Sequence, residues 1–286
     1  ERMNGIAVNL SDDPRSNLRP GLFDAEVAIK NLELVKSLRK PAGFYNPSNP
    51  KAKGVEKIDD DADEENENKT TEELSKSLRS PILSFANTDM AFRDDLLVTG
   101  SYHGFNIYQI NAVGIPELLS SVVCPGGQGD VSIVEDLLIM SVEETRSRLN
   151  CGLEGVSKEA SADRFRGLRI FDISDVFKPK QVGAVQTCRG SHTHSVVSGP
   201  GPEGKIIVYN SGTAGVREEE EMKECIGNIP GDKRTALFRI DIIEIPISNP
   251  SKSKIVSSPA VFADPNTGAL GGLWVGGDHG EDTQDT

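Results

Sequence analysis

The most constraining feature of this sequence is a set of short strand-like segments that recurs three times in the same order. Each set begins with a compact apolar segment and continues with one in which apolar and polar residues alternate. A third segment follows after a proline or asparagine turn. Alternation is the pattern of a half-buried β-strand, whereas an amphipathic helix needs apolar residues every three or four positions. The recurrence therefore predicts an all-β fold.

Each set is preceded by one more segment with strand character, so four strands make up each unit. The first segments are NTDMAF (87–92), GDVSIV (129–134) and THSVVS (193–198). The second segments are DLLVTGS (95–101), DLLIMSV (136–142) and KIIVYNS (205–211). The third segments are GFNIYQI (104–110), GLRIFDI (167–173) and ALFRIDIIEI (236–245). The fourth segments are PELLSSVV (116–123), PKQVGAVQ (179–186) and SKSKIVSS (251–258). Repeated units of four strands predict the blades of a β-propeller.

The spacing of the units is irregular because two of them carry long insertions. The separation of Gly104 from Gly167 exceeds the ~40–50 residues of familiar propeller repeats. Residues 141–166 and 211–235, between the second and third strands of their units, are polar and charged, as surface loops are. A propeller tolerates such insertions because they leave the blade through one face.

Composition divides the chain into five parts. These are an N-terminal extension (1–30), a closing-strand segment (31–56), an acidic disordered linker (57–76), about three propeller blades (77–262) and a flexible Gly/Asp-rich tail or inter-blade loop (263–286). In the closing segment, NLELVKSL (31–38) alternates as a strand would, although AEVAIKNLELVKSL also fits an amphipathic helix. Known propellers need about four to eight blades. We therefore expect the ring to be incomplete, with the chain a fragment of a longer protein or the ring closed by another component.

Charge and hydropathy argue against two classes of interaction. The chain of 286 residues has a formal net charge of −13, whereas nucleic-acid-binding proteins concentrate Lys and Arg on one surface. No run of about 18 apolar residues is present, so we expect no membrane-spanning segment. The nucleophile motif GxSxG, the phosphate-binding P-loop and the zinc motif HExxH are all absent.

Three stretches carry a family resemblance. GLRIFDISDVFKPKQVGAV (167–185), CPGGQGDVSIVEDLLIMS (124–141) and TCRGSHTHSVV (187–197) resemble the LVIVD-repeat proteins, which are bacterial secreted or surface-associated β-propellers. The likeness runs from about Asn31 to Phe262, apart from the linker. It implies an extracytoplasmic module, secreted, periplasmic or on the cell surface. Its partner would be another protein, a surface polymer or a second copy of itself.

The resemblance also suits an oxidising compartment for the four cysteines. If they pair within blades, Cys124 bonds Cys151 and Cys188 bonds Cys225, and each bond ties an inserted loop to the strand that it overhangs. Four reduced, buried thiols are the alternative. The cysteines form no CxxC pair, which counts against a structural zinc site.

Polar residues at the start of the first strands make up the candidate site. The pairs, two positions apart in each unit, are Asn87 with Asp89, Gln128 with Asp130, and His192 with His194. Period-two alternation places both members of a pair on the same side of the strand. Since the first strand of a blade lines the central channel, we expect Asp89, Asp130 and His194 to occupy equivalent places and to converge at one mouth.

Two interpretations of this ring of side chains stay open. The candidate metal ligands are His192, His194, Asp130 and Asp89. Further candidates for ligand binding are Gln128, Asn87 and Arg189. Imidazole suits Zn, Cu or Fe and carboxylate oxygen suits Ca, so a divalent metal would indicate a hydrolase or oxidase at the channel mouth. Alternatively, these residues only hold neighbouring strands in register. His103 is expected at the tight turn between the second and third strands of the first unit, as an exposed or a turn-forming residue.

Overall fold

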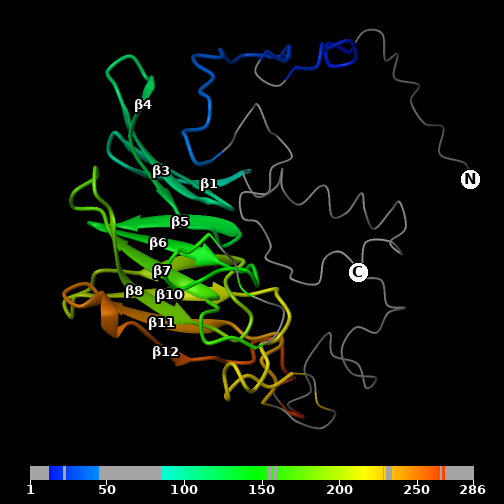
Figure 1. Cartoon of the computed structure of the whole chain (residues 1–286), viewed down its shortest axis with the longest axis vertical. Coiled ribbons are helices and arrows are strands. Elements are labelled where there is room, and N and C mark those ends of the chain that lie inside the picture. The colour runs from blue at the N-terminus through cyan, green and yellow to red at the C-terminus, as the bar shows by residue number, and fades with distance from the viewer. Residues whose placement is uncertain are drawn as a thin grey trace, which may run out of the picture.

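The computed structural model shows an all-β protein with three separate four-stranded antiparallel sheets. The structure describes residues 13–21, 24–44, 86–153, 156, 160–227, 229, 234–264 and 266–267. Within each sheet the strands lie side by side in chain order, without a crossover. Figure 1 shows the sheets stacked one above another, with the first at the top and the third at the bottom. The expected all-β class and units of four strands are confirmed.

The strands follow the segments expected from the sequence closely. The first sheet comprises β1 (Asn87–Arg93), β2 (Leu96–Ser101), β3 (Gly104–Ile110) and β4 (Pro116–Val123). The second sheet comprises β5 (Gln128–Val134), β6 (Leu137–Val142), β7 (Gly167–Asp172) and β8 (Lys180–Gln186). The third sheet comprises β9 (Thr193–Ser198), β10 (Lys205–Ser211), β11 (Asp241–Pro246) and β12 (Lys254–Ser257). A 3-10 turn, η3 (Pro250–Lys252), precedes β12.

Two strands of the third sheet are shorter than expected. The fourth segment was expected from residue 251, but η3 occupies Pro250–Lys252 and β12 begins at Lys254. We expected a strand from residue 236, but β11 begins at Asp241. The backbone N–H of Leu237 donates to Thr235 Oγ1 at 3.2 Å, and Phe238 has a φ of 55°. A positive φ is incompatible with an extended strand, so this local turn delays the start of β11.

The segment at 31–38 forms neither the expected strand nor the alternative helix. Its apolar side chains are exposed, Leu32 by 82% and Leu34 by 55%. An alternating segment becomes a strand only where a sheet edge accepts its backbone hydrogen bonds. All four strands of each described sheet come from residues 87–257, so this segment pairs with no edge of these sheets. The linker at 57–76 and nearly all of the tail at 263–286 lie outside the described residues.

The chain just after this segment is held against the first sheet. Phe44 is fully buried and meets the ring of His103 edge-on, with 5.8 Å between ring centroids. His103 lies in the turn between β2 and β3 as expected, but it is only 2% exposed, so it is a turn-forming residue and not an exposed one. Its ring also hydrogen-bonds the backbone of Gly43. The aromatic contact with Phe44 accounts for the burial of His103. The local sequence does not reveal it, because Phe44 comes from a distant part of the chain.

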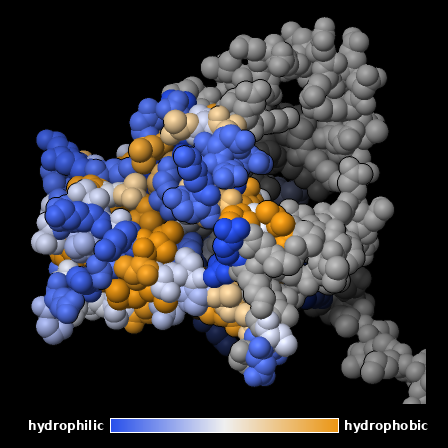
Figure 2. Space-filling model, turned by 90° about the horizontal axis from the view of Figure 1, so that it is seen from below, coloured by the Kyte–Doolittle hydropathy of each residue, from blue (hydrophilic) through white to orange (hydrophobic). Residues whose placement is uncertain are grey.

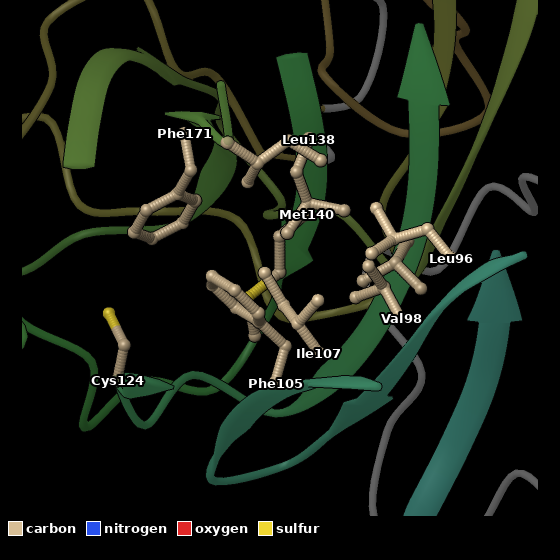
Figure 3. Packing of buried hydrophobic residues seen from close by; sticks show 10 residues of the cluster. Leu96, Val98, Phe105, Ile107, Cys124, Leu138, Met140 and Phe171 are labelled. Carbon is tan, nitrogen blue, oxygen red and sulfur yellow. The ribbon is translucent and has the colours of Figure 1, made fainter. Parts of the chain in front are cut away.

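Two apolar clusters lie between the sheets. One joins the first and second sheets, and Figure 3 shows Phe105 and Ile107 of β3 close to Leu138 and Met140 of β6. The other joins the second and third sheets through residues such as Ile139 and Val208. Complete burial of an aliphatic or aromatic side chain contributes roughly 1.5–3 kcal/mol. These clusters therefore hold the stack together.

The first and second sheets approach each other most closely at two glycines. A Cβ atom built at Gly100 would lie 1.8 Å from the carbonyl oxygen of Gly129. A Cβ atom at Gly129, where φ is 69°, would lie 2.2 Å from the carbonyl oxygen of Ser101. Only glycine allows the two backbones to come this close. The start of β5 is thereby pressed against the end of β2, beside Asp89 and Asp130.

Both disulfides implied by the family resemblance are present. Cys124 is bonded to Cys151, with 4.5 Å between Cα atoms, and Cys188 is bonded to Cys225, with 5.2 Å. Each bond connects the chain leaving one sheet to an insertion of the next. Among the described residues, no helix has the length and apolar character needed to cross a membrane.

Candidate functional site

Two carboxylates at the start of the first strands reach forward to the next sheet. Asp89 Oδ2 accepts a hydrogen bond from the backbone N–H of Val131, at 3.0 Å. Asp130 Oδ2 accepts one from the backbone N–H of His194, at 2.9 Å, and one from Thr193 Oγ1, at 2.9 Å. The two contacts repeat one arrangement, in which a carboxylate of one sheet accepts a backbone N–H of the first strand of the next sheet.

His194 points in the opposite direction, back to the second sheet. Its Nδ1 atom lies 2.8 Å from Ser141 Oγ and 3.4 Å from Asp130 Oδ2. Ser141 Oγ in turn lies 2.7 Å from Ser191 Oγ. The structure therefore brings Asp89, Asp130 and His194 together, but not from equivalent places as we expected. The aspartates point toward the following sheet, whereas the imidazole points toward the preceding one.

The long first hairpin of the third sheet explains the difference. The pattern that placed His194 with Asp89 and Asp130 assumed one phase of alternation for all three units. β9 and β10 pair with a register shift between Ile207 and Val208. A shift of one residue reverses the side of the strand on which a side chain lies.

Burial controls the protonation of this cluster. Burial lowers the pKa of His194 to about 4, although the charge of Asp89 opposes the shift. Burial also raises the pKa of Asp130, and the carboxylate of Asp89 adds to the rise, while hydrogen bonds from His194 and Thr193 oppose it. At neutral pH the imidazole of His194 is therefore uncharged. The serine, histidine and aspartate do not form a nucleophilic triad, because both partners lie at Nδ1 and the histidine side chain is fully buried.

His192 takes part in a second polar cluster, centred on Glu143. His192 Nδ1 lies 2.7 Å from Glu143 Oε2 and 2.9 Å from Gln128 Nε2. Glu143 Oε1 accepts hydrogen bonds from the N–H and hydroxyl of Thr213 and from the N–H of Ala214, at 2.6, 2.8 and 3.1 Å. One ring nitrogen either donates or accepts, so His192 makes one full hydrogen bond at a time with these partners. The cluster fixes the start of the second insertion.

The remaining candidate ligands also contact the protein itself. Asn87 Oδ1 accepts a hydrogen bond from the ammonium group of Lys40, on the N-terminal segment. Arg189 donates to the carbonyl oxygens of Ala214 and Thr213, at 2.9 Å each. The carbonyl oxygens of Thr213 and Ala214 thus accept hydrogen bonds from Arg189, and their N–H groups donate to Glu143. The polar residues at this end of the sheets join neighbouring segments of the chain.

The two insertions are joined by a buried ionic network that the sequence analysis did not detect. Glu221, in the insertion at 212–240, pairs with Arg164, in the insertion at 143–166, and with Arg217 at 2.7 Å. The side chain of Glu221 is 1% exposed. Burial alone would raise the pKa of Glu221, but the N–H of Ser161 and the two guanidinium groups outweigh burial and lower it. The carboxylate therefore stays charged and links the loops.

Another buried arginine stabilises the first insertion without a carboxylate. Arg169 on β7 is fully buried, and it donates to the carbonyl oxygens of Leu149 and Arg148, at 3.1 and 2.5 Å. Its guanidinium lies over the ring of Phe165, 4.6 Å from the centroid. Burial lowers the pKa of Arg169 to about 10, which still leaves it charged at neutral pH. The insertion thus folds around a fixed cation.

The metal interpretation finds little support in the geometry. Across the described ranges, no group of three or more His, Cys, Asp or Glu side chains is arranged to hold a metal ion. The Asp130 carboxylate already accepts hydrogen bonds from Thr193 and His194, and Asp89 accepts one from Val131. Binding a metal here would require these inter-sheet hydrogen bonds to be exchanged.

One missed residue could have been found from the predicted strand pairing. Val142 pairs with Gln128 at the ends of β6 and β5. The residue after Val142 is therefore placed beside Gln128, and that residue is Glu143. By contrast, no sequence pattern signals the pairing of Glu221 with Arg164, because the two insertions meet only in the folded chain.

Comparisons with known proteins do not assign the chain to a family. No family model matches it, and no curated protein matches it. It is similar to the crystal structure of the computationally designed Ika4 protein, with 10% identity over 61% of this chain and 72% of that chain, and a TM-score of 0.28. It is also similar to a protein from Lactobacillus plantarum, with 11% identity, 62% and 72% coverage, and a TM-score of 0.22. It is similar to Hsv2 of Kluyveromyces lactis as well, with 11% identity over 60% of this chain and 62% of that chain, and a TM-score of 0.18. These low TM-scores support no conclusion about function.

Proposed function

We propose that the three sheets are blades of a β-propeller and that the protein is an extracytoplasmic binding module. Its partner would be another protein or a surface polymer, bound at the face built by the two insertions, 143–166 and 212–240. We call this face the loop face. The observation that carries the proposal is the buried contact of Glu221 with Arg164 and Arg217, which joins the two insertions.

Rigid loops favour binding because less conformational entropy is lost when a partner docks. Each insertion is tied twice, by a disulfide and by buried polar contacts. Cys151 anchors the first insertion and Cys225 the second. Charged insertions of this length would otherwise be expected to move. A fold that fixes both of them presents one continuous surface, which suits recognition of a large partner.

The extracytoplasmic location rests on the same bonds. Disulfides persist in secreted and surface proteins and are rare in the reducing cytosol. The two bonds, together with the residues that resemble LVIVD repeats, support a secreted, periplasmic or surface-associated protein. Membership of the LVIVD-repeat family is part of the proposal, and it rests on the stretches at 124–141, 167–185 and 187–197.

The binding proposal is tested by retention on surface material. Wild-type protein is passed over immobilised surface polysaccharide and surface-protein fractions from the source cells, beside Glu221→Gln and the exposed neighbour Glu220→Gln. We expect at least one immobilised fraction to retain the wild type and Glu220→Gln, and the same fraction not to retain Glu221→Gln. Equal retention of all three proteins would remove the loop face from the proposal.

A second candidate is a metal-dependent hydrolase or oxidase, and the convergence of Asp89, Asp130 and His194 favours it. Metal analysis of the purified protein separates the two functions. A stoichiometric metal that is lost in His194→Ala would support the enzyme. A folded, metal-free protein that binds surface material would support the binding module.

A further inference from the structure

Arg166 is a buried cation whose side chain makes a single hydrogen bond to the residues that the structure describes. It ends the first insertion, directly before β7, and is 4% exposed. Its Nη1 atom donates to the carbonyl oxygen of Gly215, in the second insertion, at 2.9 Å. Its Nε atom is buried and has no hydrogen-bond partner in the described part of the chain. Buried donors without a partner are rare in folded proteins, so this one needs an explanation.

The two acids that attract Arg166 are both engaged elsewhere. Glu221 accepts hydrogen bonds from Arg164 through Oε1 and from Arg217 through Oε2. Glu143 accepts its hydrogen bonds from the start of the second insertion and contacts a histidine ring, as described above. Within the described ranges, no carboxylate forms an ion pair with Arg166. Its positive charge therefore has no direct counter-charge.

Positive charge exceeds negative charge where the two insertions meet. Arg164 and Arg217 are 6% and 5% exposed, so three buried guanidinium groups surround the one buried carboxylate of Glu221. Burial lowers the pKa of Arg166 to about 10, and the charges of Arg217 and Arg164 add to the shift against the attraction of Glu221 and Glu143. Arg166 is thus still charged at neutral pH. A buried ion normally has a partner of opposite sign, because removal from water is costly.

The charge of the molecular surface does not account for this excess. Figure 2, seen from the end of the stack that carries the third sheet, shows hydrophilic residues spread among hydrophobic ones. Charged groups on such a surface are solvated and need no partner. The chain as a whole has a formal net charge of −13. A group of enclosed cations in an acidic protein therefore marks one particular place, and an anion is the ligand that it lacks.

The second insertion leaves an approach to Arg166 at Gly215. Gly215 is exposed, and a Cβ atom built on it would meet no atom within 4 Å. Its carbonyl oxygen holds Nη1 of Arg166, so the guanidinium extends from the interior to this open surface. Arg189 donates to the carbonyl oxygens of the two preceding residues, Thr213 and Ala214. Two guanidinium groups thus lie along the same short segment.

We propose that Arg166 and the segment at Gly215 form a binding site for an oxyanion, either a carboxylate or a sulfate. A guanidinium presents Nε and a terminal nitrogen as parallel donors, which match two oxygens of one oxyanion. The unpartnered Nε supplies one of these donors, and the anion supplies the missing counter-charge. Because Nε is closed to bulk water, the anion enters by displacing the segment that Nη1 holds. The site does not depend on a ring of blades.

Titration calorimetry with sodium sulfate in low-salt buffer tests the site. We expect the wild type to show one saturable site per chain. Arg166→Gln should weaken the binding of sulfate by about tenfold or more, because hydrogen bonds to a charged group are lost. The control is Lys223→Gln, which removes one positive charge at an exposed position of the same insertion and should bind sulfate as the wild type does.

A second pair of variants leaves the buried arginine in place, so that a folding defect of Arg166→Gln does not decide the result. Gly215→Asp adds a carboxylate at the exposed approach and should weaken the binding of sulfate, whereas the neutral Gly215→Ser should preserve it. Far-ultraviolet circular dichroism checks that each variant is folded. A folded wild type without saturable sulfate binding would overturn the proposal. Binding that is unchanged in both Arg166→Gln and Gly215→Asp would overturn it as well.

A free oxyanion and an acidic group on a surface polymer share this chemistry, and a competition experiment distinguishes them. Polygalacturonate, an acidic polysaccharide, is titrated beside the neutral dextran. Binding of polygalacturonate that sulfate displaces would support a polymer-borne carboxylate as the ligand. Binding of sulfate without polygalacturonate would support a free oxyanion. Retention of surface material that survives Arg166→Gln would leave the proposed function intact without this site, so the two proposals fail separately.

Discussion

Asp130 Oδ2 accepts a hydrogen bond from the backbone N–H of His194 at 2.9 Å, so a side chain of the second sheet is bonded to the backbone of β9, the first strand of the third sheet. The same oxygen accepts the hydroxyl of Thr193. This carboxylate therefore serves to position the third sheet.

The substitution Asp130→Ala should lower the free energy of unfolding by about 1–3 kcal/mol, because it leaves the partly buried N–H of His194 without its acceptor. Asp130→Asn, which keeps one oxygen, should cost less. Urea unfolding measures both changes. The control is Asp94→Asn in the exposed β1–β2 turn, where asparagine tolerates the φ of 53°. If Asp130→Ala were as stable as Asp94→Asn, the contact would have no role in holding the sheets.

The substitution Glu221→Gln should destabilise the insertions strongly. It leaves Arg164 and Arg217 buried without their counter-charge, and loss of one partner of a buried pair costs about 3–5 kcal/mol. We expect proteolysis to become faster within 143–166 and 212–240, and cleavage within the sheets to change less. The exposed Glu220→Gln serves as control. Identical proteolysis of the two variants would show that the network does not order the loops.

Loss of either disulfide should lower stability by about 3–4 kcal/mol in the chain-entropy model. The bonds close loops with sequence separations of 27 for Cys124–Cys151 and 37 for Cys188–Cys225. Paired Cys→Ser variants, followed by urea unfolding with and without reductant, measure each contribution. Reductant should destabilise the wild type and leave the variant without cysteines unchanged. Reaction of the native protein with a thiol reagent would contradict the pairing.

Stability should rise as the pH is raised from about 4 to about 6.5. Burial lowers the pKa of His194 to about 4, whereas an unfolded histidine has a pKa of about 6.5. Between these values the unfolded chain binds more protons than the folded chain, so stability is complete above 6.5 and is lost as the pH falls toward 4. His194 contributes on the order of 3 kcal/mol. Burial also lowers the pKa of His103 to about 4, so it acts in the same direction.

Urea unfolding at a series of pH values checks this dependence. His194→Gln should flatten the slope, and the remainder should come from His103. His192→Gln is the control, because the side chain of His192 is 43% exposed. A slope that His194→Gln leaves unchanged would mean that His194 is protonated in the folded protein near its ordinary pKa.

The strands were largely predictable because their information is local. Alternation and turn residues placed β3, β4, β9 and β10 at their observed bounds. The segment at 31–38 shows the limit of this reasoning. It has the pattern of a strand, but a strand also needs a partner, and the partner is a property of the whole fold.

The candidate site was only partly predictable for a related reason. Repetition of the units led us to expect Asp89, Asp130 and His194 near one another, and Asp130 does contact His194. The direction of His194 depends on a register shift in the third sheet, which local pattern does not reveal.

The sequence by itself determined the units of four strands, the polar character of the insertions and the acidic charge, since each depends on composition or on neighbouring residues. Only the tertiary structure decided that Glu221 joins the two insertions and that His103 is buried beside Phe44. Those features arise from contacts between residues far apart in the chain, where burial and the register of whole sheets set which groups meet.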